Sequence, residues 1–136
     1  MTNVLLVAHG KLATEMKNSA EMIFGELPNF YPIEFLKEDG FDSIKENALN
    51  ILEQLEGGTL VVADLFGGTP FNACCGLAME YPEKGIEVLS GMSLPLVLEV
   101  AAMQHAKAPQ EIIDYLLSVC ANMVKRFVIE EEEDEF

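Results

Sequence analysis

Positively charged residues are scarce in this sequence. Eight Lys and Arg residues stand against 23 Asp and Glu residues, which gives a formal net charge of −15. This balance argues against nucleic acid as a partner, because no basic surface is available to replace the counterions of a phosphate backbone. The charge favours a basic protein partner or a cationic ligand, which long-range attraction would steer towards the chain.

Cysteine and histidine are also rare. The three cysteines are Cys74, Cys75 and Cys120, and the two histidines are His9 and His105. No Cys-x-x-Cys pair and no Cys/His cluster is present, so the sequence predicts no metal site. We expect reduced cysteines that pack as small hydrophobic side chains.

Long apolar runs are absent as well. No stretch reaches the roughly 18 residues that a membrane-spanning helix needs. The first apolar run is not preceded by a basic segment, as it would be in a signal peptide. The chain has 136 residues, half of them hydrophobic, which is enough for one domain with its own core. We therefore expect a cytoplasmic protein with one domain at residues 1–129 and an acidic tail at residues 130–136.

Strand-like and helix-like segments alternate along the chain. The expected strands are 4–8, 31–36, 59–64 and 86–89, with a short final strand at Arg126–Ile129. Apolar residues at helical spacing predict a first helix that buries Leu12, Met16, Ala20 and Ile23. A second helix follows a cap at Asp42 or Ser43, and a third follows a cap at Thr69. Pro95 and Pro109 begin the last two, and the last helix should bury Ile112, Ile113, Leu116, Leu117, Cys120 and Val124.

Four successive strand–helix units predict an α/β fold with a doubly wound, mainly parallel sheet and helices on both of its faces. Residues 60–63 are continuously apolar, which is typical of a strand buried on both faces of a parallel sheet. Pro32 favours an edge position for the second strand, because proline cannot donate to a central ladder. The expected strand order is 2-1-3-4, so the first and third strands are neighbours.

His9 is the most informative residue, because it ends the first strand and precedes Gly10. In an open α/β fold, the carboxyl ends of neighbouring strands form the crevice where ligands bind. Asp64 ends the third strand and should lie within reach of His9. A carboxylate there would orient the imidazole and leave its other nitrogen free to attack. From the local sequence alone, a turn residue is an equally good interpretation of Asp64.

The segment from Asp64 to Asn72 contains Gly67 and Gly68 immediately before a helix. Glycines permit a tight turn and a close approach to a ligand. The free amides at a helix N-terminus attract an anion, and Thr69 can add a hydroxyl donor. The segment is neither a P-loop nor a dinucleotide fingerprint. It therefore predicts a site for a lone phosphoryl or carboxylate group.

Four motifs carry a resemblance to a known family. They are Val4-Leu-Leu-Val-Ala-His9-Gly10, Ala20-Glu-Met22, Asp64-Leu-Phe-Gly-Gly-Thr-Pro-Phe-Asn72 and Ser90-Gly-Met-Ser-Leu-Pro95. Together they resemble the mannose-family enzyme IIA (EIIA) of the bacterial phosphoenolpyruvate-dependent sugar phosphotransferase system, over nearly the whole chain. Ala8 departs from the family, which carries a small polar residue or glycine there in many relatives.

The resemblance implies a phosphocarrier that works through a phosphohistidine, without a cofactor. It implies that His9 accepts a phosphoryl group from HPr and passes it to enzyme IIB (EIIB), which serves the membrane subunits IIC and IID. Asp64 would orient His9, and the candidate phosphoryl-binding residues are Gly10, Gly67, Gly68 and Thr69. Phe66, Phe71, Asn72, Met92 and Ser93 are candidate rim or partner contacts. The resemblance also implies a homodimer in which an antiparallel C-terminal edge strand can be exchanged.

Other classes of protein fit less well. A receiver domain needs an acidic pair after the first strand and a lysine after the fifth, and neither is visible. A histidine phosphatase has an arginine directly before its His-Gly pair, where this chain has Ala8. A non-catalytic module that binds an anion at the glycine-rich turn stays open. So does a phosphotransfer subunit of a dihydroxyacetone kinase system, which shares the fold and motifs and differs mainly in its partner.

Overall fold

A sheet of four parallel strands forms the centre of the protein in the computed structural model, which describes residues 1–130. The strands are β1 (Asn3–His9), β2 (Phe30–Phe35), β3 (Thr59–Ala63) and β4 (Ile86–Ser90). Their order is β2-β1-β3-β4, and all three neighbouring pairs are parallel. The predicted order is confirmed, and β2 with its Pro32 lies at an edge as expected.

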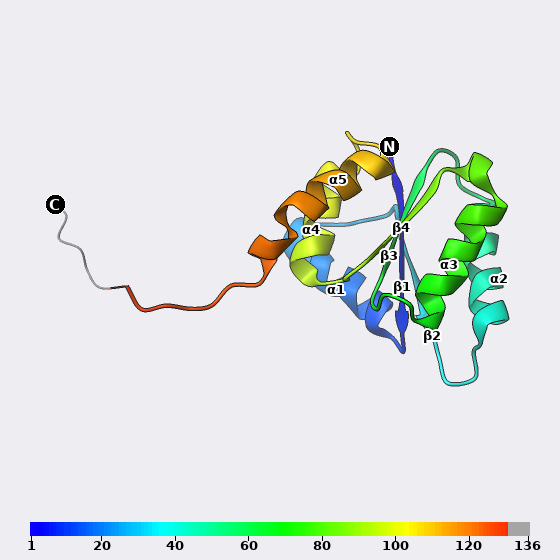
Figure 1. Ribbon diagram of the computed structural model, residues 1–136, viewed down its shortest axis with the longest axis horizontal. Coiled ribbons are helices and arrows are strands. Elements are labelled where there is room, and N and C mark those ends of the chain that lie inside the picture. The colour runs from blue at the N-terminus through cyan, green and yellow to red at the C-terminus, as the bar shows by residue number, and fades with distance from the viewer. Residues whose placement is uncertain (131–136) are drawn as a thin grey trace.

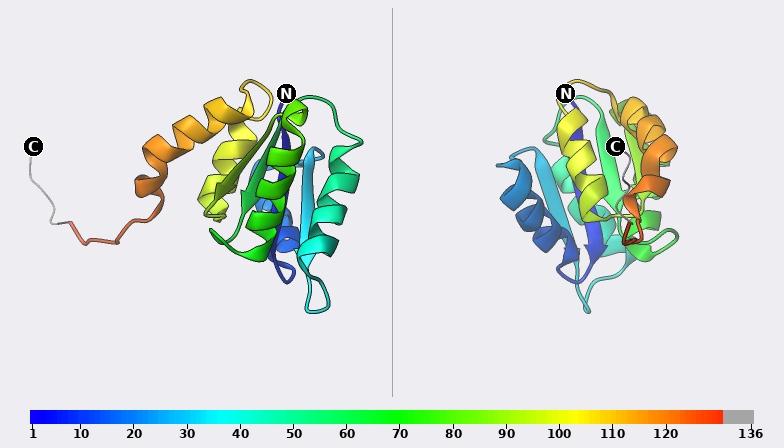
Figure 2. Two further views of the ribbon diagram at one scale, coloured as in Figure 1. Left: turned by 45° about the vertical axis from the view of Figure 1, so that its right-hand side comes forward. Right: turned by 90° about the vertical axis from the view of Figure 1, so that its left-hand side faces the viewer.

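Helices cover both faces of the sheet (Figure 1, Figure 2). On one face lie α1 (Leu12–Phe24), α4 (Leu94–Met103) and α5 (Pro109–Val119), and on the other lie α2 (Phe41–Leu52) and α3 (Thr69–Glu80). The described residues also form two short 3-10 helices, η1 (Pro82–Lys84) and η2 (Cys120–Met123). This arrangement confirms the doubly wound α/β fold.

The central strands supply both halves of the core. Leu5 and Val7 of β1 pack with α2 and α3, whereas Leu6 and Ala8 pack with the helices of the opposite face. All four side chains are fully buried. Full burial of an aliphatic side chain stabilises a fold by about 1.5–3 kcal/mol. Residues of β1 therefore alternate between two hydrophobic cores, and His9 at its end follows the same alternation.

The buried face of α1 differs from the prediction. Ala13 and Ala20 are fully buried and Met16 packs against the core, but Leu12 and Ile23 are exposed. Two sets of apolar residues on this helix could each face the sheet, one that includes small side chains and one with larger side chains. The set that contains the alanines faces the sheet, because small side chains allow a helix to approach a sheet closely.

The last helix is shorter than expected. α5 ends at Val119, and the chain continues as the tighter η2. Ile112 and Leu116 are buried, but Leu117, Cys120 and Val124 are exposed, so the predicted buried face was wrong at its C-terminal end. Leu117 follows the buried Leu116 directly and so points about 100° away from it around the helix. Beyond Val119, the tighter turn changes the angular spacing and moves the later residues off the core-facing stripe.

The segment Arg126–Ile129 forms no strand within the chain. Residues 124–130 have no regular secondary structure and run away from the body (Figure 1). The predicted edge strand is therefore absent from this single chain, because the segment does not reach the free edge of β4. Residues 131–136 of the predicted acidic tail lie outside the described residues. Within residues 1–130, no helix combines the length and the apolar character needed to cross a membrane.

Candidate functional site

His9 and Asp64 meet at the carboxyl ends of β1 and β3. The Nδ1 atom of His9 lies 2.9 Å from the Oδ2 atom of Asp64. The imidazole is 47% exposed and the carboxylate side chain is 13% exposed. Because a carboxylate can only accept here, Nδ1 carries the hydrogen and Nε2 keeps its lone pair. No hydrogen bond within residues 1–130 uses Nε2, so this atom is available as a nucleophile.

The carboxylate of Asp64 is also tied to the main chain. Its Oδ2 atom accepts a second hydrogen bond, at 3.0 Å, from the backbone N–H of His9. The backbone N–H of Asp64 in turn donates to the carbonyl of Val7 at 3.2 Å. The other carboxylate oxygen, Oδ1, is buried and has no partner among the described residues. One oxygen therefore holds both the backbone and the ring of His9, so a turn role alone does not account for Asp64.

Phe35, a residue that the sequence analysis did not name as part of the site, also contacts the imidazole. Its ring lies edge-to-face with His9, with centroids 5.5 Å apart and planes at 86°. Phe35 is the register partner of His9 in the β1–β2 pair. The predicted strand order already placed the end of the second strand beside His9, and this was the signal that could have identified Phe35.

Gly10 and Gly68 use their amides within the protein. The N–H of Gly10 donates to the carbonyl of Phe35 at 2.7 Å, and that of Gly68 donates to the carbonyl of Leu65 at 3.1 Å. Neither amide is free for a ligand in this conformation. What the two glycines offer is backbone shape. Gly10 has a φ of 61°, and an added Cβ at Gly68 would lie 3.2 Å from the Cε1 atom of His9.

The N-terminus of α3 carries the free amides of the site. Gly67 has a φ of 80°, a left-handed conformation that favours glycine. Within the described part of the chain, no hydrogen bond uses the amides of Gly67, Thr69 or Phe71. Thr69 is the first residue of α3 and Gly68 is the N-cap, so the prediction of Thr69 as the cap was wrong. The Thr69 hydroxyl caps nothing, which leaves it available to an anion near this helix end.

Two aromatic rings and an amide flank this loop. Phe66 and Phe71 pack together with centroids 4.9 Å apart, and Phe66 is 77% exposed. The side-chain amide of Asn72 donates to the carbonyl of Gly67 at 3.0 Å. Asn72 therefore braces the turn, and Phe66 presents an apolar surface to the solvent in the loop between β3 and α3.

Met92 and Ser93 follow β4. The N–H of Met92 donates to the carbonyl of Ala63 at 3.1 Å, and its side chain packs against the core on the α1 and α4 face. The hydroxyl of Ser93 accepts from the N–H of Leu96 at 3.3 Å and caps α4. Both residues have structural partners, and Ser93 is half-buried beside the loops of the site.

The cysteines are free thiols. Cys74 lies on α3 and is buried, Cys75 is half-buried and Cys120 is exposed. Burial, and to a smaller extent the neighbouring Cys75, raises the pKa of the Cys74 thiol to about 12. Burial also raises the pKa of Cys75. Within residues 1–130, no group of three or more His, Cys, Asp or Glu side chains could hold a metal ion.

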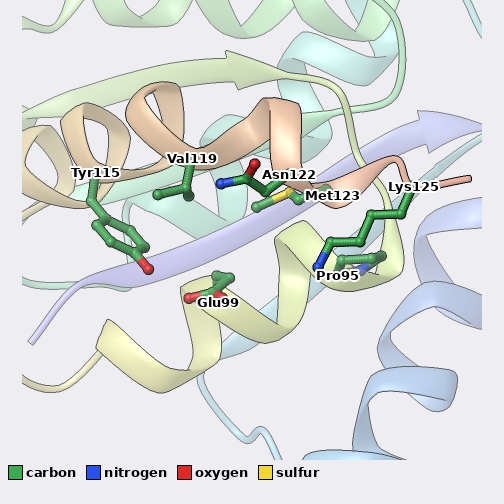
Figure 3. Close-up of a pocket in the computed structure, with 7 residues that line it drawn as sticks. All are labelled: Pro95, Glu99, Tyr115, Val119, Asn122, Met123 and Lys125. Atoms are coloured by element: carbon green, nitrogen blue, oxygen red, sulfur yellow. The ribbon is translucent and has the colours of Figure 1, made fainter. Parts of the chain in front are cut away.

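One hollow is lined by residues of the C-terminal helices. It has a volume of about 600 Å³ and is bordered by α4 and the α5–η2 segment (Figure 3). Its lining includes Glu99, Tyr115 and Lys125, and none of its residues is a predicted site residue. The His9 imidazole lies instead at an exposed edge of the sheet.

Comparison with known proteins agrees with this fold and its motifs. The family model EIIA-man, described as "PTS system fructose IIA component", matches residues 3–117. The sorbose-specific EIIA component of Lacticaseibacillus casei is 32% identical over 138 residues, which cover 98% of this chain and 99% of that protein. The fructose-specific EIIA component of Bacillus subtilis (strain 168) is 30% identical over 118 residues, or 85% of this chain and 80% of that protein.

A solved structure supports the same conclusion. The mannose/sorbose-specific IIA subunit of the phosphotransferase system from Enterococcus faecalis is 30% identical, with a TM-score of 0.86, and the match covers 97% of this chain and 98% of that one. Sequence and fold together define a component of a sugar phosphotransferase system. The chain belongs to the EIIA-man family, so the resemblance seen in the sequence is confirmed.

Proposed function

We propose that this chain is a phosphocarrier that accepts a phosphoryl group from phospho-HPr on His9 and passes it to EIIB. The lone pair of Nε2 attacks phosphorus, the bond from phosphorus to the HPr histidine breaks, and its electron pair returns to that imidazole. Transfer to EIIB repeats the exchange in the other direction. The observation that carries the proposal is the 2.9 Å contact from His9 Nδ1 to Asp64 Oδ2, which leaves Nε2 free.

The surroundings of His9 suit a phosphoryl group that must arrive and leave easily. Phosphorylation of Nε2 makes the ring cationic while Nδ1 keeps its hydrogen, and the Asp64 carboxylate stabilises that charge. The phosphoryl oxygens would meet the free amides and hydroxyl at the start of α3, which stabilise a dianion without a metal. The candidate phosphoryl-binding residues are Gly67, Thr69 and Phe71, with Gly10 and Gly68 shaping the loop.

Partner docking would use the exposed surface around His9. HPr is expected to carry basic residues near its phosphohistidine, and the charge of −15 on this chain would attract it. Phe66 offers an apolar contact at the same edge. We place the protein in the cytoplasm, where EIIB links it to the membrane subunits IIC and IID.

The experiment that tests this function is phosphorylation by phosphoenolpyruvate, enzyme I and HPr, followed by mass spectrometry to locate an acid-labile phosphate. We expect one phosphoryl group, on His9. His9→Ala should abolish the label and keep the fold by circular dichroism. His105→Ala is the matched control, since it removes the only other histidine, and it should be labelled fully. Label that persists in His9→Ala contradicts the assignment.

We also propose a homodimer in which residues 126–129 of one chain add an antiparallel strand to β4 of the other. β4 is an edge strand, and an unpaired edge readily accepts another strand. Beside it lies a largely apolar groove of about 300 Å³ lined by residues that include Leu89, Leu117 and Val124. Phe127 and Ile129 alternate along the segment and are 86% and 81% exposed.

Light scattering at micromolar concentration tests the dimer. The full chain should have twice the monomer mass, and a chain that ends at Met123 should be a monomer with its circular dichroism spectrum retained. A monomeric full chain would refute the dimer. A dimer that survives the truncation would refute strand exchange.

A further inference from the structure

The contact between His9 and Asp64 does not fix the imidazole by itself. A single hydrogen bond at Nδ1 restrains one distance, so coupled rotation about the two side-chain torsions of His9 can still tilt the ring. The direction of Nε2 depends on these torsions, because Nε2 is not itself held by a hydrogen bond within residues 1–130. Other contacts must therefore hold the plane of the imidazole if Nε2 is to point in one direction.

Gly68 leaves room beside the ring of His9. A Cβ atom at this position would lie 3.2 Å from the Cε1 atom of His9, closer than ordinary contacts. The backbone does not require glycine here, since φ is −75° and ψ is 168°, a conformation open to any residue. Gly67 is the opposite case: its φ of 80° requires glycine, and its Cβ would meet nothing within 4 Å. Glycine at position 68 is therefore explained by the room it leaves for the imidazole.

Phe35 contacts the imidazole edge-to-face, with ring centroids 5.5 Å apart. Phe35 is the last residue of β2 and is paired with His9 of β1. Its carbonyl also accepts a 2.7 Å hydrogen bond from the N–H of Gly10, the residue after His9. The aromatic ring and the residue that it orients are thus anchored to the same pair of strands.

We propose that Phe35 and Gly68 form a slot that sets the plane of the imidazole and so aims Nε2 at the incoming phosphorus. Phe35 is a positioning residue, and Gly68 provides the space. The inference rests on the proposed function for its effect on phosphoryl transfer. Small errors in aim are costly, because displacement at phosphorus requires the attacking atom to be in line.

The first test is the rate of phosphoryl transfer from phospho-HPr in a single turnover. An edge-to-face pair is worth about 0.5–1.5 kcal/mol, so Phe35→Leu should lower the maximal rate by about 2- to 12-fold while the half-saturating HPr concentration stays unchanged. Phe35→Tyr keeps the ring and should restore the rate. Tyr31→Leu is the matched control, because Tyr31 is half-buried on the same strand and packs in the core beneath α2 and α3.

Two results would overturn the positioning role. One is an unchanged maximal rate in Phe35→Leu, or a change confined to the half-saturating concentration, which would make Phe35 a partner contact. The other is an equal loss in Tyr31→Leu, which would indicate a general effect of core packing.

Gly68→Ala provides an independent test. The added methyl should push the ring and slow transfer, with the urea midpoint unchanged. In the double variant with Phe35→Leu, the ring can move away from the methyl group. The two rate effects should then be less than multiplicative, as for residues that act on a shared neighbour. Fully multiplicative effects would show that the two residues do not share the ring.

A measurement on the unphosphorylated protein separates this inference from the proposed function. Carbon-13 relaxation at Cε1 of His9 reports the mobility of the ring without any phosphoryl transfer. Mobility should rise in Phe35→Leu and stay unchanged in Tyr31→Leu. If the His9 ring were no more mobile in Phe35→Leu than in Tyr31→Leu, the slot would be refuted even if His9 carries phosphate. A rigid slot in a protein that HPr does not label would refute only the proposed function.

Discussion

Replacing Asp64 with Asn is the most direct test of how the carboxylate acts. The Oδ2 atom of Asp64 accepts from both the backbone N–H and the Nδ1–H of His9. An Asn side chain can keep its carbonyl oxygen in that position, so both contacts and the fold are retained. What Asp64→Asn removes is the negative charge beside a ring that would become cationic on carrying the proposed phosphoryl group.

The size of the effect follows from the loss of a charge-assisted hydrogen bond. Hydrogen bonds to charged groups contribute about 1.5–3 kcal/mol. The imidazole is 47% exposed, so solvent screening favours the lower end of the range. A loss of about 1.5–2 kcal/mol in the transition state slows transfer by about 10- to 30-fold.

The assay is rapid-quench transfer of radioactive phosphate from phospho-HPr, with nitrogen-15 NMR of the His9 ring in parallel. We expect Asp64→Asn to keep the Nδ1–H tautomer and transfer slowly. Asp64→Ala loses both the charge and the acceptor, so it should mix the tautomers and transfer more slowly still. Asp42→Asn removes a carboxylate at the start of α2 and should transfer normally. Transfer by Asp64→Asn at the unmodified rate would show that the charge plays no part.

Two further predictions concern stability. Gly67→Ala forces an alanine into a φ of 80° and should lower the free energy of unfolding by about 1–2 kcal/mol. An unchanged urea midpoint would refute the strain argument. Cys74 is protonated in the folded chain up to about pH 12, whereas the unfolded chain releases this proton near pH 9. The raised pKa therefore contributes stability that is full below about pH 9 and is lost as the pH rises towards about 12. In Cys74→Ala, the free energy of unfolding measured with urea should fall less over that pH interval. An identical pH dependence in the variant and the unmodified protein would contradict this prediction. Iodoacetamide should modify the exposed Cys120 and leave Cys74 unmodified, as mass spectrometry can check.

The sheet could be predicted because each central strand is a short apolar run bounded by turn residues. Continuous hydrophobicity at residues 60–63 indicated burial on both faces, and the alternating order of strands and helices fixed the parallel topology. The rotation of each helix could not be predicted in the same way. Leu12 and Ala13 are both apolar, and only the fit of α1 against the sheet decides which of them is buried.

The candidate site was predictable where it depends on strand ends, and less so where it depends on detailed geometry. The strand order brought His9 and Asp64 together, as the structure confirms. It equally brought Phe35 to that edge, but an apolar residue in a strand gives no local sign that it contacts a functional ring. Which amides of the glycine-rich loop are occupied depends on carbonyls such as those of Leu65 and Phe35, and that pairing exists only in the folded chain.

The shielding of one side of the imidazole has a consequence for the timing of transfer. Asp64, Phe35 and Gly68 occupy the inner surroundings of the His9 ring, so the nitrogen that would take up phosphate is also the only one that can release it. If His9 carries the phosphoryl group, its donor and its acceptor would both have to reach the same Nε2 atom. The two proteins could not be bound there together, so each turnover would require one to depart before the next arrives.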